Sequence, residues 1–188
     1  MNLFMSNIEE HQILIGKLRA LDGDVQLAGQ LAANILVKSG KILLCGNGGS
    51  ASDCQHIAAE LTGRFIKDRK PLAAIALTTD TSALTSIGND YSFDEVFARQ
   101  VVALGCSGDL LIGISTSGNS RNVIRAVEEA KKMGMQTIGL LGRDGGQLAH
   151  MCDYNIVVPS NVTARIQECH ILIGHTLCGL IEKELGLA

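Results

Sequence analysis

The feature of this sequence that most constrains its fold is a set of short apolar runs. In each run the apolar residues follow one another instead of alternating with polar ones. A strand of that kind is covered on both faces, which is the usual state of a parallel strand. The sequence therefore predicts five parallel strands, at Lys41–Cys45, Leu72–Leu77, Asp109–Ser115, Gln136–Leu141 and Tyr154–Val158.

Segments with helical character lie between these runs, at residues 50–63, 94–104 and 122–133. Strands that alternate with helices predict an α/β fold, a doubly wound five-stranded parallel sheet flanked by helices. Residues 3–39 have a helical period that breaks near 21–24, which predicts two N-terminal helices ended by Gly40. Residues 163–185 predict one long C-terminal helix closed by Gly186.

The chain has 188 residues, two prolines and no long polar linker. We therefore expect a single domain over residues 1–188, with N-terminal helices at about 3–39, a sheet core at 41–158 and a C-terminal helix at about 163–185. Hydrophobic residues make up 46%, but aromatic residues only 3% and tryptophan is absent. The core must therefore be built from Leu, Ile, Val and Ala.

Charge and segment properties argue against several functions. The net charge is −3 and the basic residues are scattered, so neither nucleic acid nor a membrane surface is an expected partner. The first twelve residues do not resemble a secretory signal, and the most apolar stretch, Ile171–Ile181, is too short to cross a bilayer. We expect a cytoplasmic protein whose six cysteines, none in a C-x-x-C pair, are reduced.

A turn rich in hydroxyl groups follows the third predicted strand. It contains four hydroxyls in six residues and precedes a helix, at Ser115, Thr116, Ser117 and Ser120. Ligands of open parallel sheets bind beyond the carboxyl ends of the strands, and a helix N-terminus with hydroxyl donors attracts anions. An ordinary helix cap would need only one serine. The turn therefore predicts a site for the phosphate of a sugar phosphate.

A glycine-rich turn, Gly46–Ser50, follows the first predicted strand. Its Gly46-x-Gly48-x-x-Ala51 spacing also fits a dinucleotide-binding turn, with Asp80 as the ribose ligand, and a glycine turn without any ligand is a further alternative. The dinucleotide interpretation is weaker, because Asp80 lies far along the chain and the hydroxyl-rich turn would have no role. The pattern of a nucleoside-triphosphate loop is absent.

Two sets of polar side chains in helical segments are candidates for chemistry. His56 and Glu60 are four residues apart and share one helix face, and Gln167 and His175 lie roughly on one face of the last helix. A single histidine in an apolar stretch is usually a core residue, and a single His/Glu pair is usually a surface contact. Both sets together indicate either an acid–base pair, Glu60 and His175, or a divalent metal site, with zinc the first choice.

The remaining histidines have no comparable pattern. His11 and His150 are expected on the surface, and His170 is expected to face a different side of the last helix from His175.

Four stretches of the chain resemble the phosphoheptose isomerases of the sugar isomerase (SIS) fold. They are CGNGGSASDCQHIAAELTGRF, ALTTDTSALTSIGNDYSFDEVF, GDLLIGISTSGNSRNVIRA and ARIQECHILIGHTLCGLIEKEL. The resemblance implies an aldose–ketose isomerase that converts sedoheptulose 7-phosphate to D-glycero-D-manno-heptose 7-phosphate through an enediol. That reaction is the first step of heptose nucleotide synthesis for lipopolysaccharide or related glycans.

The resemblance also implies roles for individual residues. Glu60 and His175 would be the catalytic pair. One zinc per active site would be held by His56, Glu60, Gln167 and His175, with no nucleotide cofactor. Family members are homotetramers, and we expect the apolar stretch Ile171–Ile181 to pack against other copies. Substrate contacts would fall on Asn47, Gly48, Gly49, Glu60, Asn89, Asp90, Ser115, Thr116, Ser117, Ser120 and Gln167.

Two other functions remain as alternatives. One class of SIS proteins is non-catalytic and binds the bacterial replication initiator, but its members lack the glutamate and the downstream histidine. Here both are present, at Glu60 and His175, which favours an enzyme. A regulator that senses sugar phosphates would normally carry a DNA-binding segment, and none is visible.

Overall fold

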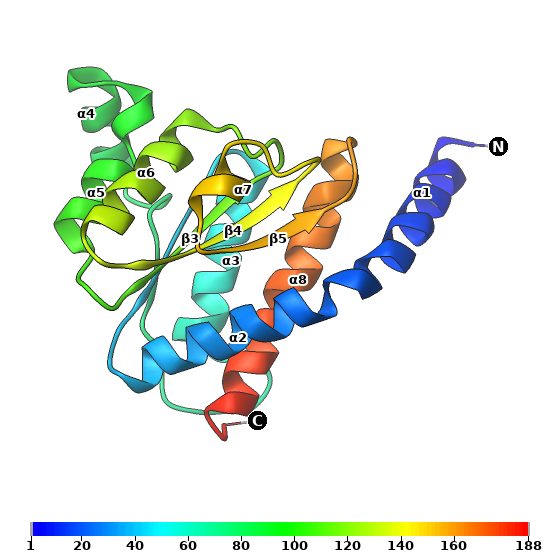
Figure 1. Ribbon diagram of the computed structural model, residues 1–188, viewed down its shortest axis with the longest axis horizontal. Coiled ribbons are helices and arrows are strands. Elements are labelled where there is room, and N and C mark those ends of the chain that lie inside the picture. Colours follow the sequence, from blue (N-terminus) through cyan, green and yellow to red (C-terminus); the bar gives the residue numbers. More distant parts are fainter. Residues whose placement is uncertain (1, 188) are drawn as a thin grey trace.

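A computed structural model describes residues 2–187 as a five-stranded, fully parallel sheet with the strand order β2-β1-β3-β4-β5 (Figure 1). All five predicted strands are present, and the predicted doubly wound α/β fold is confirmed. The strands are β1 Ile42–Gly46, β2 Ala74–Ala76, β3 Leu110–Ser115, β4 Gln136–Gly142 and β5 Tyr154–Val158.

The three central strands, β1, β3 and β4, are buried along almost their whole length. The edge strands are less protected: Ile75 in β2 is 39% exposed, and β5 begins with the exposed Tyr154. β2 is also shorter than predicted, because the run 72–77 contributes only three residues to the ladder. Continuous apolar runs thus identified the buried strands most accurately.

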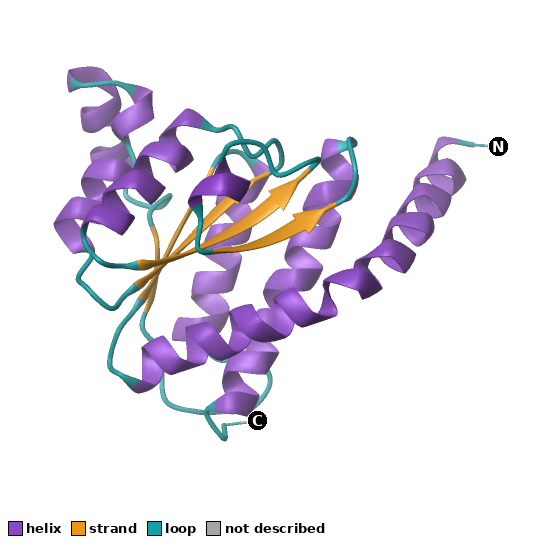
Figure 2. Cartoon of the chain, viewed as in Figure 1, coloured by secondary structure: helices purple, strands orange, loops and turns teal. Residues whose placement is uncertain are grey.

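Helices cover both faces of the sheet (Figure 2). Successive residues of β1 show the division, because Ile42 and Leu44 belong to one apolar cluster and Leu43 and Cys45 to another. The first cluster includes residues of α2 (Asp22–Val37), α3 (Gly49–Thr62) and α8 (Thr163–Glu184). The second includes residues of α5 (Ala98–Leu104), α6 (Arg121–Lys132) and α7 (Leu148–Met151).

The N-terminal segment forms two helices that are almost continuous. α1 (Leu3–Leu18) passes through the 3₁₀ turn η1 (Arg19–Leu21) into α2, and α1 projects away from the sheet (Figure 1). The break thus lies slightly before the predicted position. At the end of α2 the left-handed residue is Ser39, with φ 64°, and not Gly40. Gly40 is needed for space instead, because a Cβ there would lie 2.8 Å from the side chain of Ile35.

The apolar stretch of α8 is used mainly inside the chain. Ile173, Leu177 and Ile181 are buried in the chain's own core, whereas Leu172 is 46% exposed. Burial against other copies is therefore not needed to explain most of this stretch. Within residues 2–187, no helix has the length and apolar character that a membrane span requires.

One element between β2 and α5 was not predicted, the helix α4 (Thr81–Asp90). The 3₁₀ turn η2 (Phe93–Glu95) lies at the start of the predicted helical segment 94–104, which becomes regular helix only at α5. The many Ser and Thr residues of α4 hide its periodicity, and none of its residues is buried. Asp80 caps this helix, since its carboxylate accepts a hydrogen bond from the backbone N–H of Ala83 at 2.9 Å. This cap gives Asp80 a structural role, and the dinucleotide interpretation loses the residue it needed.

Candidate active site

The two predicted turns lie side by side because β1 and β3 are neighbours in the sheet. β2 flanks the other side of β1, so the winding of the chain reverses between β1 and β3, which is where open α/β sheets bind ligands. The side chains of Asn47, in the first turn, and Asn122, in α6, exchange two hydrogen bonds of 2.8 Å. Sequence reasoning missed Asn122, although its place two residues after Ser120 was a usable signal.

The hydroxyl-rich turn is held in one shape by its own hydrogen bonds. The Oγ atoms of Ser115 and Ser120 are 3.0 Å apart, and the backbone N–H groups of Gly118 and Asn119 donate to the hydroxyls of Ser115 and Ser117. Gly118 has φ +66°, and a Cβ there would lie 1.9 Å from the carbonyl oxygen of Gly145. Only glycine fits this position.

Ser120 occupies the N-cap position of α6, but its side chain makes no capping hydrogen bond. A serine that served only as a cap would bond to the first turn of the helix. The capping alternative therefore does not account for Ser120. Its hydroxyl points instead to Ser115, and the half-buried Thr116 and Ser117 lie in the same turn. Hydroxyls beside the N-terminus of a twelve-residue helix form a suitable anion site.

Helices α3 and α8 pack side by side and run in the same direction, with glycines at their contacts. A Cβ on Gly49, at the start of α3, would lie 2.3 Å from the amide nitrogen of Gln167. Further along, a Cβ on Gly174 would lie 2.7 Å from the side chain of Ile57. The absence of side chains lets the helices approach closely, which brings the polar residues of α3 next to those of α8.

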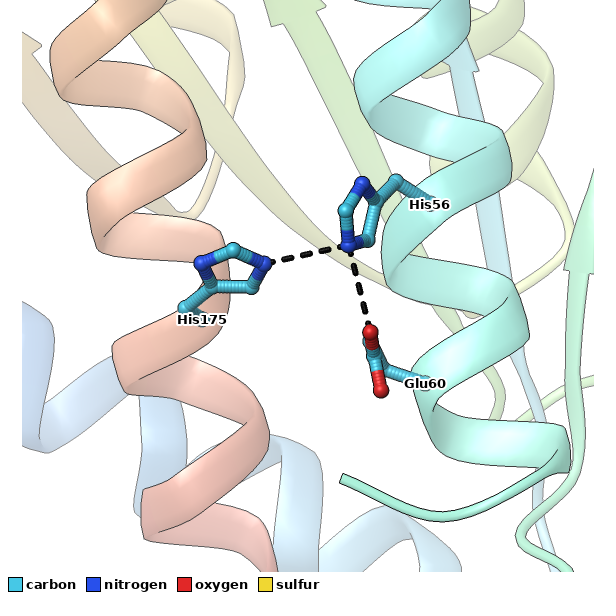
Figure 3. A group of neighbouring side chains, drawn as sticks. All are labelled: His56, Glu60 and His175. Carbon is cyan, nitrogen blue, oxygen red and sulfur yellow. Dashed lines mark hydrogen bonds and ion pairs between the residues drawn. The ribbon is translucent and has the colours of Figure 1, made fainter. Parts of the chain in front are cut away.

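Three of the predicted site residues meet between these helices (Figure 3). Nε2 of His175 lies 3.1 Å from Nε2 of His56, and Nε2 of His56 lies 3.2 Å from Oε1 of Glu60. The two imidazole rings are edge-to-face, with centroids 4.9 Å apart. The side chain of His56 is 47% exposed and that of Glu60 is 25% exposed, so solutes can reach the group.

The donor atoms of this group fit a metal ion. Nε2 of His56 carries one proton or one lone pair, yet both Glu60 and His175 approach it. A metal ion bound between the three atoms removes this conflict, because each atom can then offer a lone pair to the ion. Donors about 2.0–2.1 Å from a tetrahedral zinc ion are about 3.3–3.4 Å from one another. The separations of 3.1 Å between His175 and His56 and of 3.2 Å between His56 and Glu60 are close to this value, and all three atoms lie within 4.8 Å of one another.

Phe65 is part of the same environment and was not predicted. Its ring stacks on that of His175, with centroids 5.6 Å apart and an angle of 28° between the planes. The signal that could have identified it is its position in the stretch AAELTGRF, five residues after Glu60. The ring covers one face of the imidazole and limits its orientation.

Gln167 and the residues of α4 are placed differently from the three-residue group. The amide of Gln167 lies against Gly49, so it lies between the glycine turn and His175 along α8. Asn89 and Asp90 are exposed at the end of α4 and bond to each other at 2.8 Å. Within residues 2–187, no hydrogen bond joins these two residues to the turns or to the histidines.

The other histidines do not join the group. His150 is exposed, as predicted, whereas His11 is half-buried and paired with Glu168 at 2.7 Å. His170 faces away from His175, and its Nε2 donates to the carbonyl oxygen of Leu141 at 2.9 Å. Burial lowers the pKa of His170 to about 4, against a smaller opposing effect of that hydrogen bond, so the ring is neutral.

No cysteine belongs to the group of His56, Glu60 and His175. All six are unpaired, and five of them are buried. Burial raises the pKa of Cys152 and of Cys178 to about 12, so these thiols stay protonated at neutral pH.

The fold and the paired turns define a SIS-domain protein, and the family model described as "SIS domain" matches residues 9–142. A relative from Campylobacter jejuni named phosphoheptose isomerase is 57% identical over 97% of this chain and 98% of its own. The solved phosphoheptose isomerase of Neisseria gonorrhoeae shares 50% identity over 96% of this chain and 97% of its own, with a TM-score of 0.91. The Francisella tularensis structure, also a phosphoheptose isomerase, shares 41% identity over 96% of both chains, with a TM-score of 0.93.

The chain belongs to the phosphoheptose isomerase family. The resemblance drawn from the four stretches is confirmed, as is the prediction of an isomerase. The alternative of a non-catalytic protein that binds the replication initiator is not favoured, since Glu60 and His175 are both present and grouped.

Proposed function

We propose that this protein isomerises sedoheptulose 7-phosphate to D-glycero-D-manno-heptose 7-phosphate. The observation that carries the proposal is the meeting of Glu60, His56 and His175 between α3 and α8. α3 begins at the glycine turn, and that turn is bonded through Asn47 to the helix that follows the hydroxyl-rich turn. A base on the helix that begins at the glycine turn, with an anion site in the neighbouring turn, suits a phosphorylated sugar.

The hydroxyl-rich turn would hold the phosphate. Its donors are neutral hydroxyls and the N-terminus of α6, and no lysine or arginine lies within Ser115–Ser120. Binding energy from the phosphate end would orient the reacting carbons at the other end of the sugar. Asn47, Gly48 and Gly49 line the neighbouring turn and would contact the sugar, as would Gln167; we extend the same proposal to Asn89 and Asp90.

Glu60 would be the base. It would take the proton from C1 of the ketose, leaving an enediol, and return that proton to C2 to complete the aldose. The hydroxyl proton must move from O1 to O2 in the same conversion. His175 would carry it and assist ring opening, and the stacked Phe65 would keep its imidazole in place.

Zinc would be held by His56, Glu60 and His175, with Gln167 as the fourth ligand. A bound zinc ion would polarise the sugar oxygens. The chain's own donors fit the ion, as the distances among His56, Glu60 and His175 indicate. Gln167 is included on the family resemblance, since its amide lies against Gly49, about two turns earlier in α8 than His175.

Incubation of the protein with sedoheptulose 7-phosphate tests the proposal, with NMR to detect the aldose. We expect the aldehyde-derived anomeric signals of the heptose product to grow to an equilibrium level. If the substrate remains unchanged, with and without added zinc, the proposed reaction is wrong for this protein.

We also propose that the active protein is a cytoplasmic homotetramer. Sugar phosphates are charged and do not cross membranes unaided, so their isomerase would act where they are made. Support for assembly comes from α1, which projects from the body with Leu3, Phe4 and Ile13 between 65% and 79% exposed. Apolar side chains at such positions suit contacts between copies. Light scattering at micromolar concentration checks the mass, and a monomer would contradict the proposal.

A further inference from the structure

A buried ion pair lies just beyond the site, between the loop that follows α3 and the last turns of α8. Nε of Arg69 donates to Oε1 of Glu182 at 2.8 Å, and the two side chains are 2% and 0% exposed. The charged groups of Arg69 and Glu182 make no hydrogen bond or ion pair with the side chains of His56, Glu60 or His175. The ion pair nevertheless connects α3 and α8, the two helices that carry that group.

The guanidinium of Arg69 holds the carboxyl end of α3. It donates to the carbonyl oxygens of Glu60 and Leu61, each at 2.8 Å, and to that of Gly63 at 3.1 Å. The last carbonyls of a helix have no partner within the helix, and a cation near them is favourable. Arg69 therefore caps the turn of α3 that bears Glu60.

Glu182 holds the residue that follows. Its Oε1 also accepts a hydrogen bond from the backbone N–H of Phe65 at 3.1 Å, and the ring of Phe65 stacks on His175. Burial alone would raise the pKa of Glu182, but the Phe65 N–H and Arg69 outweigh it and hold the pKa below its ordinary value. The carboxylate is therefore charged, and it fixes the backbone of Phe65 to α8.

Stability alone explains this pair poorly. Removing two charges from water is unfavourable, and apolar residues of similar volume often serve as well or better. Here one carboxylate oxygen, Oε2 of Glu182, is buried without a hydrogen-bond partner among residues 2–187. The directional bonds to Glu60 and Phe65 are what an apolar pair could not supply.

We propose that Arg69 and Glu182 are positioning residues for the active site. By bonding to the carbonyl of Glu60 and the N–H of Phe65, they fix the position of the Glu60 carboxylate relative to the ring of His175. The inference rests on the proposed function only for its effect on turnover. The effect of Arg69 and Glu182 on the position of the His175 ring does not depend on any reaction.

The test uses two variants of the full-length protein. The double variant Arg69→Met/Glu182→Met removes both charges together, which avoids leaving one of them buried and unpaired. Arg69→Lys keeps the charge but loses the planar fork that reaches several carbonyls. We expect kcat to fall about 10–100-fold in both, as for other residues that orient active-site ligands, with KM for sedoheptulose 7-phosphate changed less than about twofold.

A matched control is Asp109→Asn. Asp109 is also a buried carboxylate paired with a cation, Lys41, but within residues 2–187 its side chain bonds only to Lys41 and the backbone of Cys106, and not to α3 or α8. We expect its loss to lower the melting temperature while kcat stays at the wild-type value. If Asp109→Asn lowers kcat as much as the double variant, a general loss of stability explains both and the proposal is wrong.

A second readout does not depend on catalysis. The Phe65 ring, stacked on His175, shifts the ring-proton signals of that histidine, which can be followed by NMR with ¹³C-labelled histidine and assigned with His175→Asn. We expect these signals to move in both Arg69 variants and not in Asp109→Asn. Folded variants with wild-type kcat and unchanged His175 signals would overturn the inference. If wild type proves inactive, the proposed function fails, and the His175 signals alone decide the positioning role.

Discussion

Nε2 of His175 lies 3.1 Å from Nε2 of His56, although 119 residues separate them in the chain. The contact depends on helices α3 and α8, which pack closely because Gly174 presents no side chain to Ile57. Glu60 joins the same atoms one turn further along α3. The chemistry proposed for this protein therefore depends on how closely two helices approach.

Gly174→Ala should disturb this approach. The new Cβ would lie 2.7 Å from Cδ1 of Ile57, a buried side chain with little room to move. We expect a loss of about 1–3 kcal/mol in the free energy of unfolding, the usual range for overpacking, together with weaker zinc binding. Chemical denaturation and metal titration measure the two effects.

Gly179→Ala is the matched control in the same helix. Its Cβ would meet the Phe65 ring at 3.5 Å, an ordinary contact, and alanine favours helix. We expect no loss of stability. If both alanine variants behave alike, the close approach at Gly174 is not important for the group.

Glu60→Gln should remove the base and keep the shape of the side chain. General base catalysis contributes about 10²–10⁴-fold, so we expect kcat to fall by at least about 10². The variant should still bind sedoheptulose 7-phosphate, because the hydroxyl-rich turn is unchanged. In D₂O, wild type is expected to incorporate deuterium at the carbon that receives the proton, and the variant should not. Near-wild-type turnover by Glu60→Gln would show the assignment of the base to be wrong; Glu184→Gln, an exposed residue of α8, is the control.

Ser117→Ala combined with Ser120→Ala should weaken phosphate binding. A hydrogen bond to a charged group is worth about 1.5–3 kcal/mol, so losing even one raises KM about tenfold or more. The fold should remain, because Gly118 and the hydrogen bond from its backbone N–H to the hydroxyl of Ser115 are retained. Steady-state kinetics give KM, and Ser6→Ala on α1 controls for the loss of a hydroxyl elsewhere. An unchanged KM in the double variant would exclude the turn from the site.

Wild-type protein grown or incubated with zinc should contain one zinc ion per chain. His56→Ala should lose most of it, because one imidazole of the four proposed ligands is missing, whereas His11→Ala should keep it. Gln167→Ala should bind more weakly if the amide is the fourth ligand. Elemental analysis after removal of free metal is the measurement. Equal zinc content in wild type and His56→Ala would contradict the proposed metal site.

His170 should make the protein less stable in acid. In the unfolded chain its pKa is near 6.5, whereas burial lowers the pKa to about 4 in the folded state. Between these values the unfolded state binds more protons, so the free energy of unfolding falls as pH decreases from 6.5 to 4. The whole effect corresponds to about 3 kcal/mol.

His170→Gln tests this effect, since the amide can still donate to Leu141 but does not titrate. We expect the pH dependence between 6.5 and 4 to be shallower in the variant than in wild type. Denaturation should be carried out with a chelator, so that loss of a bound metal does not contribute to the curves. Parallel curves for the two proteins would show that His170 does not cause the loss.

Much of the fold could be predicted because burial on both faces of a strand leaves a local signature. The runs around Leu43, Leu111 and Leu140 are continuous, and each became a strand of the sheet's interior. Helix α4 could not be predicted in this way, because none of its residues is fully buried and its apolar residues Leu84 and Ile87 stand among serines and threonines. The same limitation applied to Ser39, whose left-handed backbone follows from its position after α2 and not from its residue type.

The sequence by itself determined the strands, the two turns and the residue types able to bind a phosphate or a metal, because each depends on neighbours along the chain. Only the tertiary structure decided which of them meet. The pairing of β1 with β3 brought the two turns together, and the packing of α3 on α8 joined His56 to His175. It also linked Arg69 to Glu182 and Phe65 to His175. Such contacts depend on the distance between two helices, which no single segment specifies.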